Sequence, residues 1–173
     1  GKRELFKGLY IEDKWNWSEK YPVIRINFAV DIKTLSEIYE IIRNEVRLNY
    51  KRMEIEKEKE ENHVGLMLQN LLIEVSERYK KQVVVLIDEY DKPILDVIED
   101  KTQAEEVRRT LKEFYSVLKG LDEYIKFVLV TGVSKFAKVS LFSGLNQLED
   151  ISLDKRYGDI CGYTQEELEN YFK

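Results

Sequence analysis

Three acidic residues follow a run of aliphatic side chains in the segment VVVLIDEYDKPI, residues 83–94. Asp88 and Glu89 come directly after the aliphatic residues, and Asp91 follows two positions later. Carboxylates grouped in this way could hold a divalent metal ion and activate a water molecule for attack on a phosphate. They could equally mark the end of a buried strand, with Asp88 capping the strand and Glu89 in solvent. The pattern alone leaves both interpretations open.

Polar residues also follow a second apolar run, IKFVLVTGV, at residues 125–133. Thr131, Gly132 and Ser134 lie at its end. If the two runs form neighbouring parallel strands, these residues and the acids share the sheet edge where open α/β sheets bind ligands. A polar residue there could then contact a γ-phosphate or the attacking water. The alternative is a glycine turn with ordinary hydroxyl capping.

Strand-type and helix-type patterns alternate along the chain around these residues. The β-rich runs cover residues 22–30, 82–90 and 125–133. The second and third runs are almost continuously apolar, which is typical of strands buried on both faces of a parallel sheet. Apolar residues recur at helical spacing in the segments that begin at Leu35, Leu68 and Val107. This alternation predicts an α/β sandwich with parallel strands.

Length and composition narrow the class of protein. The chain has 173 residues, which suits a single domain, and 28 basic against 33 acidic residues give a net charge of −5. This balance lacks the overall excess of basic residues that is typical of nucleic-acid-binding proteins. A lone cysteine, Cys161, excludes an internal disulfide framework. Because no apolar run approaches the roughly 20 residues of a membrane span, we expect a soluble cytoplasmic protein.

Two local patterns predict features outside the strands. Residues 50–62, YKRMEIEKEKEEN, are nearly all Lys and Glu, which predicts an exposed helical extension or a mobile charged connector. Thr164 is followed three residues later by Glu167, a spacing typical of the capping box at the start of a helix.

These motifs together resemble the AAA-ATPase-like family of bacterial and archaeal proteins, whose members often carry a PD-(D/E)xK-type nuclease domain further along the chain. The resemblance rests on four segments that occur in matching order, ELFKGLYI, YPVIRINF, VVVLIDEYDKPI and FVLVTGVSKFAKVSLFSGLNQLEDISLDKRYGDICGYTQEEL. It implies a three-layer sandwich with a mainly parallel sheet, like an ASCE P-loop NTPase. Residues 83–88 would be the Walker B strand and residues 126–131 the sensor strand.

The resemblance also implies roles for individual residues. Asp88 would be the ligand of Mg²⁺, usually through water, and Glu89 the general base that activates the attacking water. Thr131 would be the polar residue that ends the sensor strand, close to the γ-phosphate. We place Ser134 beside it among the residues that bind the nucleotide.

One part of the family pattern is missing from the sequence. No G-x-x-x-x-G-K-[ST] loop occurs, and Gly1-Lys2 is followed by Arg3. We therefore expect residues 1–173 to be a partial AAA-ATPase-like domain that lacks the strand and helix of the phosphate-binding loop. Such a domain would be inactive alone and would bind neither ATP nor Mg²⁺, although its longer parent protein would use both.

Two other interpretations stay open beside a partial ATPase. The chain could be a degenerate P-loop fold that serves as a protein-interaction or regulatory scaffold for a nuclease. Asp88, Glu89 and Asp91 could instead form a two-metal nuclease site. That third interpretation is disfavoured because no well-placed E-x-K pattern accompanies the acids.

The missing loop has a consequence for the sheet. We expect strands 23–30, 83–88 and 126–131 to pair in that order, with residues 150–153 forming a short strand separated from them by a gap. The gap would leave strand 126–131 with an open edge, and open apolar edges favour pairing with another chain. The sequence thus predicts a homo-oligomer through this edge, no membrane partner, and an ATPase whose target, nucleic acid or protein, stays unspecified.

Overall fold

The computed structural model describes residues 2–56, 61–133, 141–142, 145, 147–158, 160 and 162–172. Its centre is a parallel sheet of three strands, β1 (Val23–Asn27), β2 (Val83–Asp88) and β3 (Ile125–Val130), in the order β1-β2-β3. The predicted α/β fold and the predicted strand order are therefore confirmed. A parallel sheet flanked by helices is consistent with a three-layer P-loop-like sandwich.

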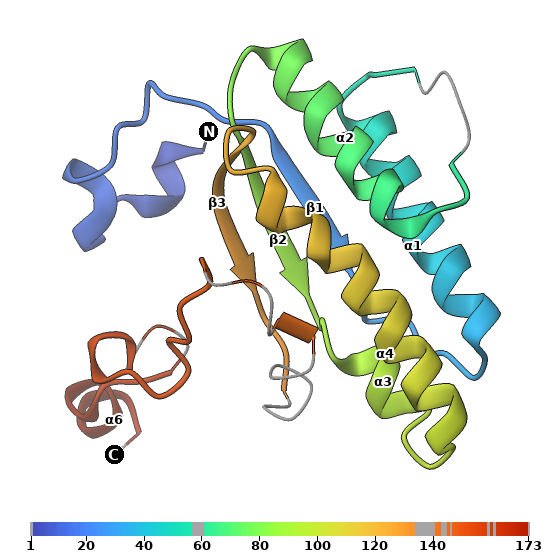
Figure 1. Ribbon diagram of the computed structural model, residues 1–173. Coiled ribbons are helices and arrows are strands. Elements are labelled where there is room, and N and C mark those ends of the chain that lie inside the picture. The colour runs from blue at the N-terminus through green and yellow to red at the C-terminus, as the bar shows by residue number, and fades with distance from the viewer. Residues whose placement is uncertain are drawn as a thin grey trace.

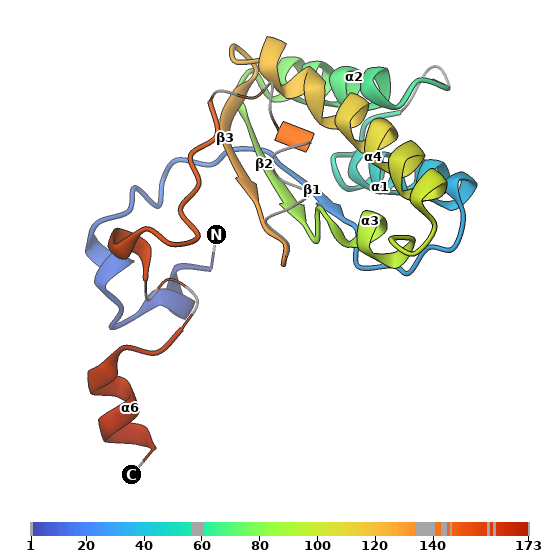
Figure 2. The same cartoon turned by 60° about the horizontal axis from the view of Figure 1, so that its bottom comes forward.

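Three long helices cover one face of the sheet (Figures 1 and 2). They are α1 (Leu35–Arg52), α2 (Val64–Tyr79) and α4 (Lys101–Ser116). The short helix α3 (Lys92–Asp96) follows β2 directly, and α6 (Gln165–Tyr171) lies near the C-terminus. Single 3₁₀ turns cover Arg3–Phe6, Tyr10–Asp13, Val117–Gly120 and Lys155–Tyr157. The N-terminal turns and α6 lie on the β3 side of the molecule, away from α1 and α2 (Figure 1).

Side chains at the helix starts explain where the helices begin. Thr34 and Glu37 form a capping box at the start of α1, and Thr164 and Glu167 form the predicted one at α6. The Asp100 carboxylate accepts hydrogen bonds from the backbone amides of Thr102 and Gln103 in the first turn of α4. These contacts satisfy amides that have no partner within the helix.

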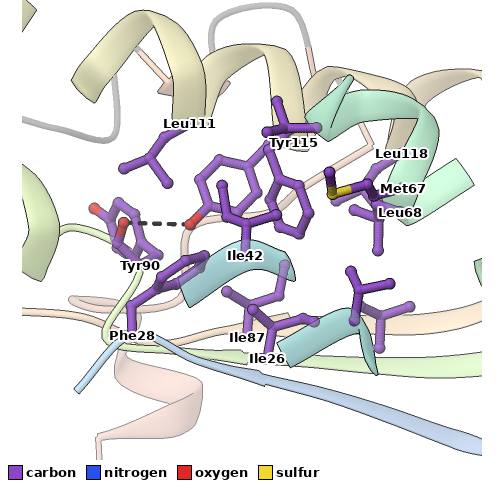
Figure 3. Close-up of a cluster of buried hydrophobic side chains, with 14 of the residues drawn as sticks. Ile26, Phe28, Ile42, Met67, Leu68, Ile87, Tyr90, Leu111, Tyr115 and Leu118 are labelled. Atoms are coloured by element: carbon purple, nitrogen blue, oxygen red, sulfur yellow. Dashed lines mark hydrogen bonds between the residues drawn. The ribbon is translucent and has the colours of Figure 1, made fainter. Parts of the chain in front are cut away.

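The hydrophobic core lies between the sheet and these helices (Figure 3). Alternate residues of β1 and β2 point into it, among them Ile26 and Ile87, each 1% exposed. Phe28 packs edge-on against Phe114 and Tyr115 of α4. The apolar spacing that predicted the three helices therefore corresponds to their buried faces.

The two outer edges of the sheet differ. At β1, Asn49 of α1 accepts from the backbone amide of Arg25 at 3.0 Å and donates to its carbonyl at 2.7 Å. Glu45 of α1 accepts from the amide of Asn27 at 3.0 Å. These side chains occupy the backbone groups that a further strand would need. In the described part of the chain, β3 pairs with β2 alone.

Some predicted boundaries differ from the observed ones. Helix α1 continues to Arg52, and Tyr50 and Met53 are buried in the core, so the charged connector predicted at 50–62 begins later than expected. Residues 57–60 of that segment lie outside the described residues. The predicted strand at 150–153 is wrong, because the Asp150 side chain accepts from the amide of Ser152 and closes a local turn. None of the described helices is long and apolar enough to cross a membrane.

Candidate active site

Asp88 is the last residue of β2, and its side chain is exposed at the carboxyl end of the sheet. Its backbone carbonyl accepts from the amide of Phe28 at 3.1 Å, which ties it to the end of β1. Its Oδ1 atom accepts a hydrogen bond from the amide of Glu89 at 3.1 Å and another from the hydroxyl of Thr131. The structure therefore brings Asp88 and Thr131 together, as the parallel arrangement predicted.

Thr131 lies one residue beyond β3, so the strand predicted at 126–131 is observed at Ile125–Val130. Its amide still donates to the carbonyl of Ile87 at 2.9 Å, and its carbonyl accepts from the amide of Tyr90 at 3.1 Å. The backbone pairing of β2 and β3 thus continues past the strand ends. This pairing places the backbone of Thr131 beside Asp88.

Glu89 has an unusual backbone conformation, with φ of 56°. This left-handed region is disfavoured for residues with a Cβ atom, and such strain concentrates at functional sites. The conformation ends β2 and turns the chain toward α3, where the amide of Lys92 donates to the Glu89 carbonyl at 3.1 Å. Glu89 is half-buried and follows Asp88 at the carboxyl end of the sheet.

The third acid of the motif has a different environment. Asp91 is fully buried, and its Oδ1 atom accepts from the amide of Val133 at 3.3 Å. Among the described residues, no group of three His, Cys, Asp or Glu side chains could hold a metal ion. Asp88, Glu89 and Asp91 therefore do not form the carboxylate cage that a two-metal nuclease site would need.

Lys92 forms ion pairs that the sequence analysis did not predict. Its Nζ atom lies 2.5 Å from Oδ1 of Asp31 and 2.8 Å from both carboxylate oxygens of Asp96. These hydrogen bonds raise the pKa of Lys92, with Asp31 contributing first and Asp96 second. Asp96 also accepts from the amide of Ile32 at 3.0 Å, so the cluster ties the segment after β1 to α3. The spacing of Lys92 and Asp96 by four residues is a sequence signal for one of these pairs, whereas nothing local indicates Asp31.

Asp88 is the residue at the strand ends whose carboxylate could contact a magnesium ion. Mg²⁺ is usually held by one or two carboxylates together with waters and substrate phosphates, rather than by an all-protein cage. An exposed Asp88 carboxylate, oriented by Thr131 and the Glu89 amide, matches that chemistry. Ser134, predicted to lie with these residues, falls outside the described part of the chain.

Comparison with known proteins gives one family model and one similar protein. A family model described as Predicted AAA-ATPase matches residues 1–142. An "Uncharacterized protein in vnfD 5'region" of Azotobacter chroococcum mcd 1 is 40% identical over an alignment of 173 positions that covers 99% of this chain. The chain spans only 33% of that relative's length. No solved structure matches the chain.

Proposed function

Because the chain belongs to the AAA-ATPase-like family, we propose that the protein carrying it binds and hydrolyses ATP at the carboxyl ends of β2 and β3. The observation that supports this most directly is the hydrogen bond from the Thr131 hydroxyl to the Asp88 carboxylate. It joins two polar residues from neighbouring strands at the sheet edge where α/β proteins bind ligands. Glu89, with its strained backbone, follows Asp88 directly in the chain.

The proposed roles follow from position and chemistry. Asp88 would hold Mg²⁺, usually through water, and the ion would supply positive charge against the phosphate oxygens. The Glu89 carboxylate would accept a proton from the attacking water at one of its oxygens. Thr131 would fix the rotamer of Asp88 through the hydrogen bond from its hydroxyl.

The groups that cradle the phosphates are a separate part of the proposal. Residues 1–173 contain no G-x-x-x-x-G-K-[ST] loop, and the chain spans 33% of the relative's length. We therefore assign the phosphate-binding loop to another segment of the full-length protein. Residues 1–173 alone would then lack a strong nucleotide site, because the backbone amides and lysine of that loop provide most phosphate contacts.

A scaffold is the second candidate function. In a degenerate P-loop fold, Asp88 and Glu89 would only end a strand, and the domain would hold a partner such as a nuclease domain of the same protein. The same missing loop motif favours this candidate. The two candidates differ in one measurable property, which is whether the full-length protein binds Mg-ATP.

The test uses calorimetric titration of Mg-ATP into the full-length protein, together with steady-state hydrolysis. We expect the Glu89→Gln variant to bind ATP with a Kd within about twofold of wild type. Its kcat should fall at least about 100-fold, which is the rate factor that a general base usually contributes. Glu99→Gln, which neutralises an exposed acid between α3 and α4, is the matched control and should keep full activity. Absence of Mg-ATP binding by the wild-type protein would support the scaffold instead.

A further inference from the structure

Asp91 is a buried carboxylate that the proposed chemistry does not use. It is 0% exposed, although Asp88, three residues earlier at the end of β2, lies in solvent. Removing a carboxylate from water is costly unless hydrogen bonds compensate for the lost hydration. A buried acid three residues beyond the proposed magnesium ligand therefore indicates a specific set of contacts.

The Asp91 side chain contacts the backbone that follows Thr131. Its Oδ1 atom accepts from the amide of Val133 at 3.3 Å. A Cβ atom on Gly132 would lie under 3.0 Å from this same oxygen and from the Tyr90 ring, so only glycine permits the approach. The segment 131–133 is thus held closely against the Asp91 carboxylate.

The main chain of Asp91 is fixed as firmly as its side chain. Its carbonyl accepts from the amides of Ile94 and Leu95 at 3.0 and 3.2 Å, which starts α3. On the core side, the Tyr115 hydroxyl donates to the carbonyl of Tyr90 at 3.3 Å (Figure 3). Burial raises the pKa of Tyr115, and the negative charge of Asp91 raises it further. The backbone carbonyls of Tyr90 and Asp91 therefore connect the segment after β2 to α4 and α3.

We propose that Asp91 is a positioning residue, whose buried carboxylate fixes residues 131–133 and thereby keeps the Thr131 hydroxyl on Asp88. This inference rests on the proposed ATPase function for its catalytic consequence. Asp91 touches neither nucleotide nor water in this scheme and acts only through Thr131. Loss of its carboxylate would free the segment after β3 and leave Asp88 without its orienting hydroxyl.

The experiment compares Asp91→Ala and Asp91→Asn in the full-length protein. Asp91→Ala should lower kcat by about 10- to 100-fold, as small misplacements in active sites do, while KM for ATP changes less than about threefold. Asp91→Asn keeps an oxygen that can accept from the Val133 amide and should recover most of the activity. Asn49→Ala removes another fully buried polar side chain, on the far edge of the sheet, and should keep its kcat when assayed below its unfolding temperature.

A double-mutant comparison tests the path of action. If Asp91 acts through Thr131, the variant that combines Asp91→Ala with Thr131→Val should be no slower than the worse single variant. The proposal would be overturned if the double variant lost kcat by the product of the two single losses. Equal losses of kcat in Asn49→Ala and Asp91→Ala would overturn it as well.

A second readout separates this inference from the ATPase proposal. Hydrogen exchange of the Val133 amide should quicken in Asp91→Ala and stay slow in Asn49→Ala, whether or not the protein hydrolyses ATP. A wild-type protein without ATPase activity would refute the proposed function only. Unchanged exchange at Val133 in Asp91→Ala would refute the positioning role itself.

Discussion

At the scale of single residues, Glu89 has a left-handed backbone just after the end of β2. Glu54 and Lys80 have similar φ values of 54° and 52°, but they follow the ends of α1 and α2, where this conformation is a common way to end a helix. Glu89 terminates a strand instead, at the position where the family resemblance places the general base. Left-handed geometry costs an L-residue about 1–2 kcal/mol, so selection for stability alone would favour glycine there.

The strain at Glu89 can be measured by comparing two substitutions. Glu89→Gly should be more stable than Glu89→Ala by about 1 kcal/mol, because glycine adopts positive φ freely and alanine does not. Lys80→Gly and Lys80→Ala form the matched pair and should show the same order. Urea denaturation gives the four unfolding free energies. If alanine is the more stable residue at 89 but not at 80, the backbone of Glu89 is unstrained.

At the scale of elements, a single polar residue before α4 fixes the start of a helix that carries a large apolar surface. Its apolar side holds the core residues Val107, Leu111, Phe114 and Tyr115. Asp100 fixes where this helix begins, since its Oδ1 accepts from the amides of Thr102 and Gln103 at 3.0 and 3.1 Å. Two hydrogen bonds from Gln103 lower the pKa of Asp100. The one from its backbone amide contributes most, and the one from its side chain comes next.

This cap predicts a pH-dependent effect on stability. Asp100→Ala should lower the thermal midpoint at pH 7 by about 2–4 °C, the usual size for a lost cap in a chain of this length. Because the pKa is lower in the folded state, the charged cap stabilises fully above the unfolded pKa, near 3.9. The difference from wild type should therefore shrink as pH falls below about 4. Glu123→Ala, which removes an exposed acid, is the control in thermal denaturation and should show no such cap effect.

At the scale of the whole molecule, the sheet has one closed edge and one edge without a described partner strand. Asn49 and Glu45 occupy the backbone of β1, whereas β3 pairs only with β2 in the described residues. Phe127 and Leu129, on the sheet face opposite the helix layer, are 53% and 38% exposed. Such an apolar strand edge favours pairing with another strand.

The predicted oligomer can be tested on residues 1–173 alone. We expect concentration-dependent association in sedimentation equilibrium, weakened about tenfold or more by combining Phe127→Lys with Leu129→Lys. Ile98→Lys changes an equally exposed apolar residue in the turn between α3 and α4 and should leave association unchanged. A wild-type chain that stays monomeric at every concentration would contradict this prediction.

The sequence by itself determined the elements and the relation between two site residues. Aliphatic runs and helical spacing depend on neighbours along the chain, so they predicted β1 to β3 and the three long helices. Parallel pairing then required the residues that end β2 and β3 to meet, which is why Asp88 and Thr131 could be placed together before the structure was known. The strand predicted at residues 150–153 is wrong, because the Asp150 side chain forms a local turn there with the amide of Ser152.

Only the tertiary structure decided which polar side chains are buried and what they hold. Asn49 bonds to Arg25, Lys92 to Asp31, and Asp91 to the amide of Val133, across 24, 61 and 42 positions of sequence. No local pattern specifies such contacts, because each depends on how two separate segments are brought together when the helices pack on the sheet. The acids of one short motif therefore have different environments, with Asp88 exposed at the candidate site and Asp91 buried three residues later.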